Sequence, residues 1–207
     1  SLFFKPDGSK MYTTGNAGDD IDEYTLSKPW DITTASHVQV FGVTSQDTNP
    51  AHVFFKPDGL KMFVIGYSNA YLYAYTLSTA WDISTASYNS VRFDVSNQET
   101  SPTDIFFKTD GLKMYVLGMY GDDVNEYNLS TAWNITTASY SQSFSVADQE
   151  TDPRSVFFHP DGIQMYVVGV SGISVKEYSV GTVISSTGYA PSVTNSGGQI
   201  DSAFWTD

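Results

Sequence analysis

Short stretches in which apolar and polar residues alternate run along most of the chain, separated by polar, glycine-rich turns. Around the third quarter of the sequence such stretches fall at residues 104–108, 113–118, 124–129 and 140–146. Alternation with a period of two is typical of a β-strand, and no stretch shows a convincing helical period. The pattern therefore predicts an all-β protein made of many short strands.

This set of strands recurs along the chain, because the phrase Phe-Phe-Lys-Pro-Asp-Gly-x-Lys-Met-Tyr returns, nearly unchanged, at regular intervals. Its four copies begin at Phe3, Phe54, Phe106 and Phe157, so consecutive copies start 51, 52 and 51 residues apart. Three more phrases keep the same order and period. They are Glu-Tyr-x-Leu-Ser from Glu23, Trp-Asp-Ile-Thr-Thr-Ala-Ser from Trp30, and Gln-Asp/Glu-Thr-x-Pro from Gln46, each with later relatives.

Each unit is interpreted as four antiparallel strands. The Pro-Asp-Gly between the first two strands predicts a tight hairpin, because proline presets φ and glycine accepts the positive φ that closes the turn. A four-stranded unit of this length, repeated in tandem, is typical of a propeller blade. Stacking around an axis buries both faces of every sheet. We therefore predict a β-propeller built from ~51-residue four-stranded antiparallel blades, with a β-solenoid as the alternative.

The blades are expected near residues 1–51, 52–103, 104–154 and 155–182. After Tyr178 the Trp-Asp-Ile phrase does not return, so the fourth unit departs from the pattern. Residues 183–207 contain Pro191 and an Asn-Ser-Gly-Gly run, which predicts a linker-like tail leading to another module, or a closing strand. Either four blades close alone, or further blades lie outside this chain.

The chain is strongly acidic, with a net charge of −13 over 207 residues. Such a charge repels nucleic acid and anionic membranes, and no apolar run approaches the roughly 18 residues of a membrane span. Neither nucleic acid nor membrane insertion is therefore expected. The chain has no cysteine and so no disulfide.

The repeated run Phe-Lys-Pro-Asp-Gly-Leu-Lys-Met-Tyr-Val-Leu-Gly, which has Thr109 in place of Pro in the copy that ends at Gly118, resembles the repeats of the YVTN and lactonase-like β-propellers. The longer unit, with Ser-Thr-Ala-Trp-Asp-Ile inserted, is similar to repeats of marine bacteria and their phages. That resemblance covers about residues 1–180 and implies a propeller in a virion, a tail fibre or a surface protein. Glycines such as Gly66, Gly118 and Gly169 stand near the place where the YVTN repeats have asparagine.

Two sets of loops vary between the units: those between the second and third strands, and those that enter the first strand. In an up-and-down blade both sets share one face beside the central channel. A single asymmetric site needs positions that differ between blades, so a ligand is expected there, with plain solvated loops as the alternative. The candidate ligand-binding residues are Asp19, Asp20, His52, Tyr67, Tyr71, Asp104, Asp122, Asp123 and Arg154.

Acidic residues gather in two of these loops, and their oxygens suit Ca²⁺. The weak calcium candidates are Asp19, Asp20, Asp22, Asp122 and Asp123. Zinc is not expected, because His37, His52 and His159 are scattered. No phosphate-binding loop or dinucleotide fingerprint is present, so no cofactor other than Ca²⁺ is considered.

Residues that recur in every unit are expected to form the framework. The recurring tryptophans are interpreted as packed aromatics, with one sugar-stacking platform per blade as the alternative. The recurring glutamates are interpreted as partly buried carboxylates that accept hydrogen bonds, and the turn aspartates as groups that bond their own backbone. These residues are Trp30, Trp81 and Trp133; Glu23, Glu126 and Glu177; and Asp7, Asp58, Asp110 and Asp161.

No Gly-x-Ser-x-Gly elbow and no plausible Ser-His-Asp order is visible. The sequence therefore favours a non-enzymatic structural or recognition module at a virion or cell surface. Its expected partners are other virion or surface proteins, a receptor, or further copies of itself. Two alternatives stay open: a glycan-binding, lectin-like propeller, and a lactonase-like hydrolase that uses Asp, His and Arg at the channel mouth.

Overall fold

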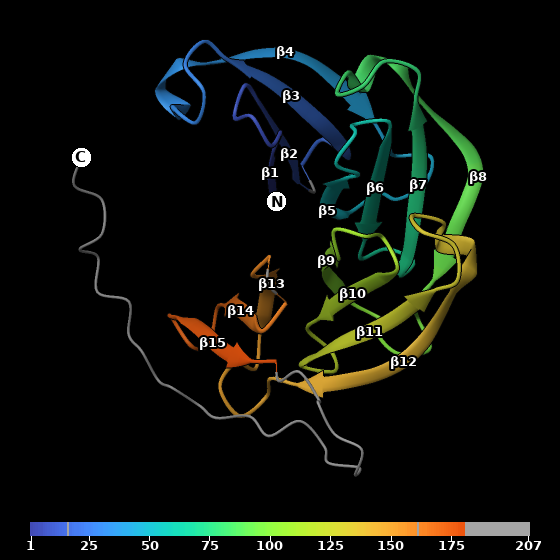
Figure 1. Cartoon of the computed structure of the whole chain (residues 1–207), viewed down its shortest axis with the longest axis vertical. Helices are drawn as coiled ribbons and strands as arrows, with labels where there is room; N and C mark the ends of the chain where they lie inside the picture. Colours follow the sequence, from blue (N-terminus) through green and yellow to red (C-terminus); the bar gives the residue numbers. More distant parts are fainter. Residues whose placement is uncertain (16, 161, 181–207) are drawn as a thin grey trace.

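The computed structural model describes residues 1–15, 17–160 and 162–180, which form an arc of four propeller blades (Figure 1). The first three blades are four-stranded antiparallel sheets, and the fourth has three strands among the described residues. The structure thus confirms the predicted all-β propeller built from repeated blades. The expected tail at residues 183–207 lies outside the described residues.

The strands follow one another in chain order within each sheet. The first blade comprises β1 (Leu2–Phe4), β2 (Lys10–Gly15), β3 (Asp20–Leu26) and β4 (Ala35–Gly42). The second comprises β5 (Pro50–Phe55), β6 (Lys61–Gly66), β7 (Tyr71–Leu77) and β8 (Ala86–Asp94). The third comprises β9 (Pro102–Phe107), β10 (Lys113–Gly118), β11 (Asp123–Leu129) and β12 (Ala138–Ser145), and the fourth β13 (Pro153–Phe158), β14 (Gln164–Gly169) and β15 (Val175–Ser179).

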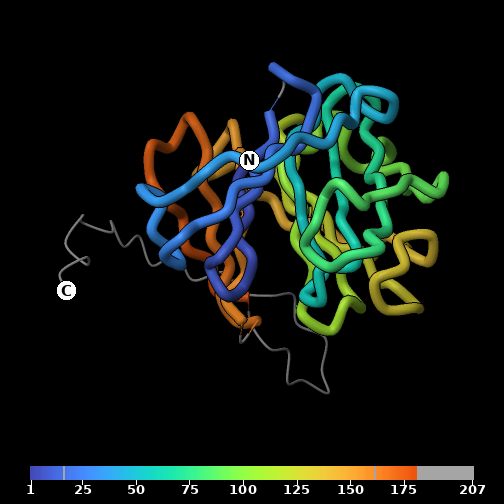
Figure 2. Tube along the Cα trace, turned by 90° about the horizontal axis from the view of Figure 1, so that it is seen from above, coloured from blue at the N-terminus to red at the C-terminus, as the bar shows by residue number. Residues whose placement is uncertain are grey.

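The first strand of every blade lies nearest the axis. β5 contacts both β1 and β9, and β9 also contacts β13, whereas β4, β8 and β12 form the outer rim (Figure 1). The N-terminus lies near the middle of the molecule both in the cartoon and in the tube view turned by 90° (Figures 1 and 2). Side chains at the start of the inner strands are therefore brought together around the axis.

Local chemistry sets the hairpin between the first two strands. The carboxylates of Asp7, Asp58 and Asp110 accept hydrogen bonds from the backbone N–H groups two residues on, at 2.9 to 3.0 Å. The glycine after each of these aspartates has φ near +70°, a conformation that glycine adopts at little cost. The predicted structural role of the turn aspartates is confirmed for these three; Asp161 lies outside the described residues.

The third and fourth strands are joined by a segment that the sequence predicted only as a longer loop. Its Trp-Asp-Ile phrase leads into a single 3₁₀ turn at η1 (Ile32–Thr34), η2 (Ile83–Thr85) and η3 (Ile135–Thr137). The Asp or Asn before each turn caps it by accepting a hydrogen bond from the residue two positions later. No helix of the described residues is long and apolar enough to cross a membrane.

This segment is what holds consecutive blades together. Trp81 and Trp133 are each only 8% exposed, and Ile83 and Ile135 are fully buried against the blade before their own. A Cβ on Gly59 or Gly111 would collide with the indole, so the turn glycine also makes room for tryptophan. The framework role of tryptophan is confirmed, and the platform alternative is wrong for these two residues because they are buried.

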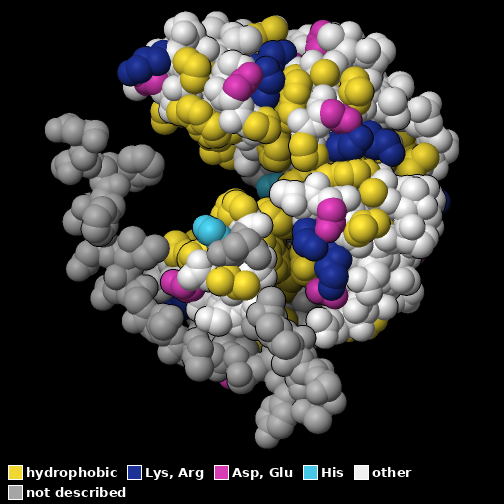
Figure 3. All heavy atoms as spheres, viewed as in Figure 1, with side chains coloured by type: hydrophobic (Ala, Val, Ile, Leu, Met, Phe, Trp, Pro, Cys, Tyr) yellow, Lys and Arg dark blue, Asp and Glu magenta, His cyan; other side chains and the backbone are white. Residues whose placement is uncertain are grey.

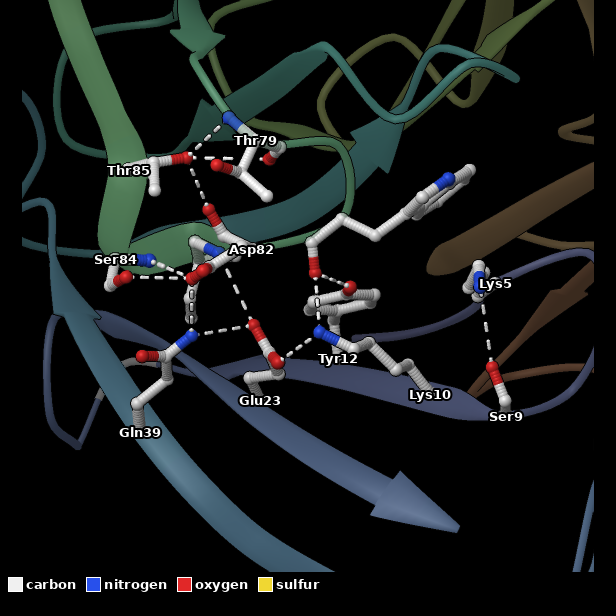
Figure 4. Close-up of polar contacts among 12 residues, drawn as sticks. Lys5, Ser9, Lys10, Tyr12, Glu23, Gln39, Thr79, Asp82, Ser84 and Thr85 are labelled. Atoms are coloured by element: carbon white, nitrogen blue, oxygen red, sulfur yellow. Dashed lines mark hydrogen bonds and ion pairs between the residues drawn. The ribbon is translucent and has the colours of Figure 1, made fainter.

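Polar contacts accompany this packing between the first two blades (Figure 4). The Trp81 carbonyl accepts hydrogen bonds from the Tyr12 hydroxyl at 2.7 Å and the Lys10 ammonium at 2.8 Å. Glu23, which is almost fully buried, accepts from Lys10, from Gln39 and from the Ile83 N–H. Glu23 thus has the hydrogen-bonded, structural role that the sequence predicted.

The described blades make an open arc. Each blade packs on the next, while the first and fourth blades stand apart (Figure 1). The space-filling view shows a hollow between them with hydrophobic side chains on both sides (Figure 3). The described residues therefore do not close a four-bladed ring.

Candidate functional site

The two variable loop sets lie side by side on one face. The loop between the second and third strands hydrogen-bonds the loop that enters the first strand in three blades, as Tyr67 N–H to Asn49 O (3.0 Å) illustrates. Equivalent bonds join Met119 to Ser101 and Val170 to Asp152. Because the inner strands begin on this face, their first side chains stand at the channel mouth.

Two of the candidate residues form a close pair there. His52, at the start of β5, places Nδ1 2.7 Å from Oδ1 of Asp104, at the start of β9. The Asp104 side chain is 1% exposed, whereas that of His52 is 13% exposed. A buried carboxylate thus orients an imidazole that still reaches solvent. With Nδ1–H donated to Asp104, Nε2 is left as a proton acceptor.

The rest of the Asp104 carboxylate is tied to the backbone and to the fourth blade. Oδ1 also accepts from its neighbour's amide, Ile105 N–H, at 2.7 Å. Oδ2 accepts from the Ser155 hydroxyl at 2.6 Å and from the Val156 N–H at 2.8 Å. These donors fix the direction of the carboxylate, so the imidazole is held by a preorganised group.

The contact between His52 and Asp104 arises because both residues occupy the same position of the repeated unit. Ser1, His52, Asp104 and Ser155 each stand two residues before the first phenylalanine of their unit, so all four occupy one position of the blade. Three of them are joined through Asp104, and the Ser1 hydroxyl accepts from Val53 N–H beside His52 at 3.3 Å. Ser155 was not among the predicted site residues, although its register with His52 is visible in the sequence.

Arg154 brings a positive charge next to this cluster. Its guanidinium donates to the Asp152 carboxylate at 2.8 to 3.0 Å, and its side chain is partly exposed. The Asp152 carboxylate, together with a hydrogen bond to Tyr67, raises the pKa of Arg154. Arg154 and Tyr67, which come from the fourth and second blades, therefore lie close together on the loop face.

The remaining candidates make contacts of their own. Tyr71 lies under the Arg92 guanidinium, whose carbon is 4.4 Å from the ring centre. Burial, followed by the nearby Asp22 and Asp19, raises the pKa of Asp20, and burial raises the pKa of Asp123. Among the described residues no three His or acidic side chains are placed to hold a metal ion, so a calcium site at Asp19, Asp20, Asp22, Asp122 and Asp123 stays a prediction.

Sequence reasoning missed the function of the Gln-Asp/Glu-Thr phrase. The carboxylates of Asp47, Glu99 and Glu150 are buried and accept N–H bonds within the loop that enters the next first strand. Glu99 and Glu150 also accept from the neighbouring loop. A Cβ on the strand-end glycine would collide with each carboxylate, which explains the glycines at 66, 118 and 169. That glycine was the available signal.

No protein-family model matches the chain, and no curated protein sequence matches it. Solved structures do. A protein from Bacteroides uniformis named as a 6-phosphogluconolactonase is 16% identical over 95% of this chain and 52% of its own, with a TM-score of 0.62. A Bacteroides fragilis protein of the same name is 16% identical over 86% of this chain and 49% of its own, with a TM-score of 0.61.

A periplasmic gluconolactonase from Pseudomonas aeruginosa is 14% identical over 86% of this chain and 49% of its own, with a TM-score of 0.55. The chain therefore spans about half the length of the structures it resembles. At these identities the likeness establishes a shared fold. By fold the chain is a β-propeller similar to the lactonase-like propellers.

These likenesses correct one expectation. The sequence predicted that the chain is not an enzyme, and the solved structures contradict this, because these three proteins that share the fold are named as lactonases. A purely structural role has no support among them, and the lactonase-like alternative is the one they favour. The place in a virion or at a cell surface stays a prediction.

Proposed function

We propose that the chain takes part in hydrolysis of a sugar lactone at the channel mouth, with His52 as the general base. The observation that carries the proposal is the short contact between His52 and the buried Asp104. An imidazole whose Nδ1 is held by a carboxylate can accept a proton at Nε2 and later return it. The lactonase names of the structural neighbours supply the reaction class.

The chemistry needs few groups. Nε2 of His52 takes a proton from a water molecule as its oxygen attacks the lactone carbonyl. The bond between the acyl carbon and the ring oxygen then breaks, and the imidazolium returns the proton to the departing alkoxide, which gives a hydroxy acid. Asp104 stabilises the imidazolium and acts as a positioning residue, as does Ser155 through its bond to Asp104.

Arg154 is suited to an anionic substituent on the lactone. It is partly exposed, carries a fixed charge and lies one residue before Ser155, whose hydroxyl reaches Asp104. A guanidinium can bind the oxygens of a phosphate in a bidentate way. We therefore expect Arg154→Gln to raise KM for a phosphorylated lactone more than for the unphosphorylated one, with kcat little changed.

The test is lactone hydrolysis followed by acid release in a pH-stat, with 6-phosphogluconolactone and gluconolactone as substrates. We expect His52→Gln to lower kcat by roughly 10²- to 10⁴-fold, the range of general base catalysis. Asp104→Asn should lower kcat and alter the pH profile, since the amide cannot hold the imidazolium in the same way.

The chain offers a matched control. His37 on β4 also faces a carboxylate, with Nε2 2.9 Å from Oδ1 of Asp22, but on the exposed outer rim. His37→Gln should leave kcat and KM unchanged. The proposal fails if the protein does not accelerate hydrolysis of either lactone, or if His52→Gln is as active as the unaltered chain.

A further inference from the structure

The interface between the first two blades shows which contacts a blade makes with the Trp-Asp-Ile segment of the next blade. The Trp81 carbonyl is held by Lys10 and Tyr12, and the Ile83 N–H by Glu23. Gln39 contacts Asp82, the middle residue of the Trp-Asp-Ile segment, because its side-chain amide donates to the Asp82 carboxylate at 2.9 Å (Figure 4). We call Lys10, Tyr12, Glu23 and Gln39 the receiving residues of the first blade.

The third blade repeats all four receiving residues. Lys113, Tyr115, Glu126 and Gln142 stand at the same places on β10, β11 and β12, as the strand pairing shows. Lys113 bonds Glu126 at 2.6 Å, as Lys10 bonds Glu23. Tyr115 stands opposite Glu126 across the β10–β11 pair, as Tyr12 stands opposite Glu23. The third blade therefore carries a receiving surface of the same chemistry.

The sequence of the fourth unit lacks the Trp-Asp-Ile phrase that fits this surface. In register with Trp-Asp-Ile of the earlier units, the sequence has Ile-Ser-Ser at residues 184–186. Gly162 has no atom of the described residues within 4 Å of where its Cβ would stand, whereas Gly59 and Gly111 touch an indole at that place. A missing segment should leave a groove here.

That groove is present. A cavity of about 300 Å³ lies between the third and fourth blades, and its lining includes Lys113, Tyr115, Glu126, Gln142, Phe158 and Gly162. A second cavity of about 90 Å³ continues from it, lined by apolar groups such as Val124, Phe144 and Met165. The groove thus joins the receiving polar groups to an apolar floor, as a pocket for an aromatic and an aliphatic side chain would.

The outer strand of the fourth sheet in the described part of the chain, β15, borders this groove. Among the described residues β15 pairs with β14 alone, while β3, β7 and β11 each pair with a fourth strand as well. An unpaired edge is a template on which another polypeptide can add a strand. In the complete blades the fourth strand follows the Trp-Asp-Ile segment directly, so one polypeptide can both occupy the groove and pair with the edge of β15.

We propose that the groove between the third and fourth blades binds a partner polypeptide in which Trp, Asp and Ile follow one another and lead into a strand that adds to β15. In the complex the tryptophan carbonyl accepts from Tyr115 and Lys113, the isoleucine N–H donates to Glu126, and Gln142 donates to the aspartate. Asp is preferred to Asn at the middle position of the peptide. The chain itself shows the correlation: the first blade has Gln39 and contacts Asp82, whereas the second blade has Val91 at the place of the glutamine and faces a segment with Asn134.

The probe is a synthetic peptide of residues 78–94, which is the segment and strand of the second blade. Titration into the full chain by calorimetry should show saturable one-to-one binding. Exchange of Trp81 for Ala in the peptide should weaken affinity at least tenfold, and exchange of Asp82 for Asn several-fold. With a photoreactive phenylalanine in place of tryptophan, cross-links should map to the groove, at residues such as Tyr115 and Phe158.

Two variants of the chain make a matched pair. Tyr115→Phe removes the hydroxyl expected to hold the peptide carbonyl and should weaken binding about three- to tenfold. Tyr12→Phe alters the same group in the first blade, where Trp81 already occupies it, and should leave peptide affinity unchanged. Neither residue belongs to the proposed lactonase site, so lactone hydrolysis reports on that site separately.

Three results would overturn this proposal. One is the absence of saturable binding, including the case in which the chain's own residues 181–207 occupy the groove. Another is cross-linking outside the third and fourth blades. The last is an equal effect of Tyr12→Phe and Tyr115→Phe on peptide affinity.

Discussion

The interface between the first two blades and the interface between the last two begin from the same receiving residues and end differently. In the first, Trp81 and Ile83 fill the space, and every receiving residue bonds across the blades or supports a group that does. In the second, Lys113 bonds Glu126 within its own blade, and both residues line a cavity together with Tyr115. The comparison shows that the segment, more than the receiving surface, decides whether a blade interface is closed.

The largest expected effect on stability comes from truncating the tryptophan that fills the closed interface. Trp81→Ala should lower the free energy of unfolding by about 3 to 5 kcal/mol, as large-to-small changes of buried aromatics do. Trp30→Ala alters the same phrase where the indole is 57% exposed and should cost about 1 kcal/mol or less. Urea unfolding measures both, and equal effects would break the comparison.

Next comes the glutamate at the centre of each receiving set. Glu23→Ala leaves the Lys10 ammonium and the Ile83 N–H without their carboxylate in a buried place, and should cost about 3 kcal/mol. Glu126→Ala alters an ion pair whose lysine is 37% exposed, so a loss of about 1 kcal/mol is expected. A loss at Glu126 as large as that at Glu23 would show that the last interface is closed after all.

A smaller effect on the free energy of unfolding is expected from the hydrogen bond between Gln39 and Asp82, which joins the first two blades. A double-mutant cycle with Gln39→Ala and Asp82→Ala should give a coupling of about 0.5 to 1.5 kcal/mol, the worth of one hydrogen bond. The corresponding cycle between Val91 and Asn134 serves as the control and should give none. If the Gln39–Asp82 cycle also gives no coupling energy, there is no reason to expect Gln142 to favour aspartate in a bound peptide.

The smallest effect concerns Asp110, whose partner Lys108 lines the open groove. The Lys108 ammonium and then the Leu112 N–H lower the pKa of Asp110, so the folded state favours the charged form. This contribution is present above the ordinary aspartate pKa of about 3.9 and is lost as the pH falls through the lower folded value. The stability difference between the unaltered chain and Asp110→Asn should therefore shrink between pH 5 and pH 3, and shrink less at high salt, which screens the exposed ion pair and leaves the Leu112 hydrogen bond.

The blades were predictable because their signals are local. Turn residues, alternating strands and the period are read from a few neighbouring residues, and the structure places β10 at the residues expected from them. The role of the tryptophans was harder to specify, because the surface that receives Trp81 lies a whole unit earlier, at Lys10 and Tyr12. Contacts between repeats depend on stacking geometry that no single unit encodes.

The candidate site was predictable as a face but not as a cluster. His52, Asp104 and Arg154 were expected among variable loop residues, and the structure joins the first two through a direct contact. Nothing in either loop alone indicates that pairing. It arises because one position of the blade is brought around the axis four times, so residues 51 or 52 apart become neighbours. The same geometry adds Ser155, which has no local signature of a site residue.

The tryptophans carry a consequence for how the arc assembles. Trp30, Trp81 and Trp133 all have φ between 61° and 66°, and each donates its N–H to the carbonyl of the turn glycine in its own blade, at 2.9 to 3.1 Å. Trp30 takes this shape without being covered by another described blade, so the segment is shaped locally. Contacts that are local in sequence form early in folding. Each blade can thus shape its docking segment from its own residues, before a neighbouring blade packs against it.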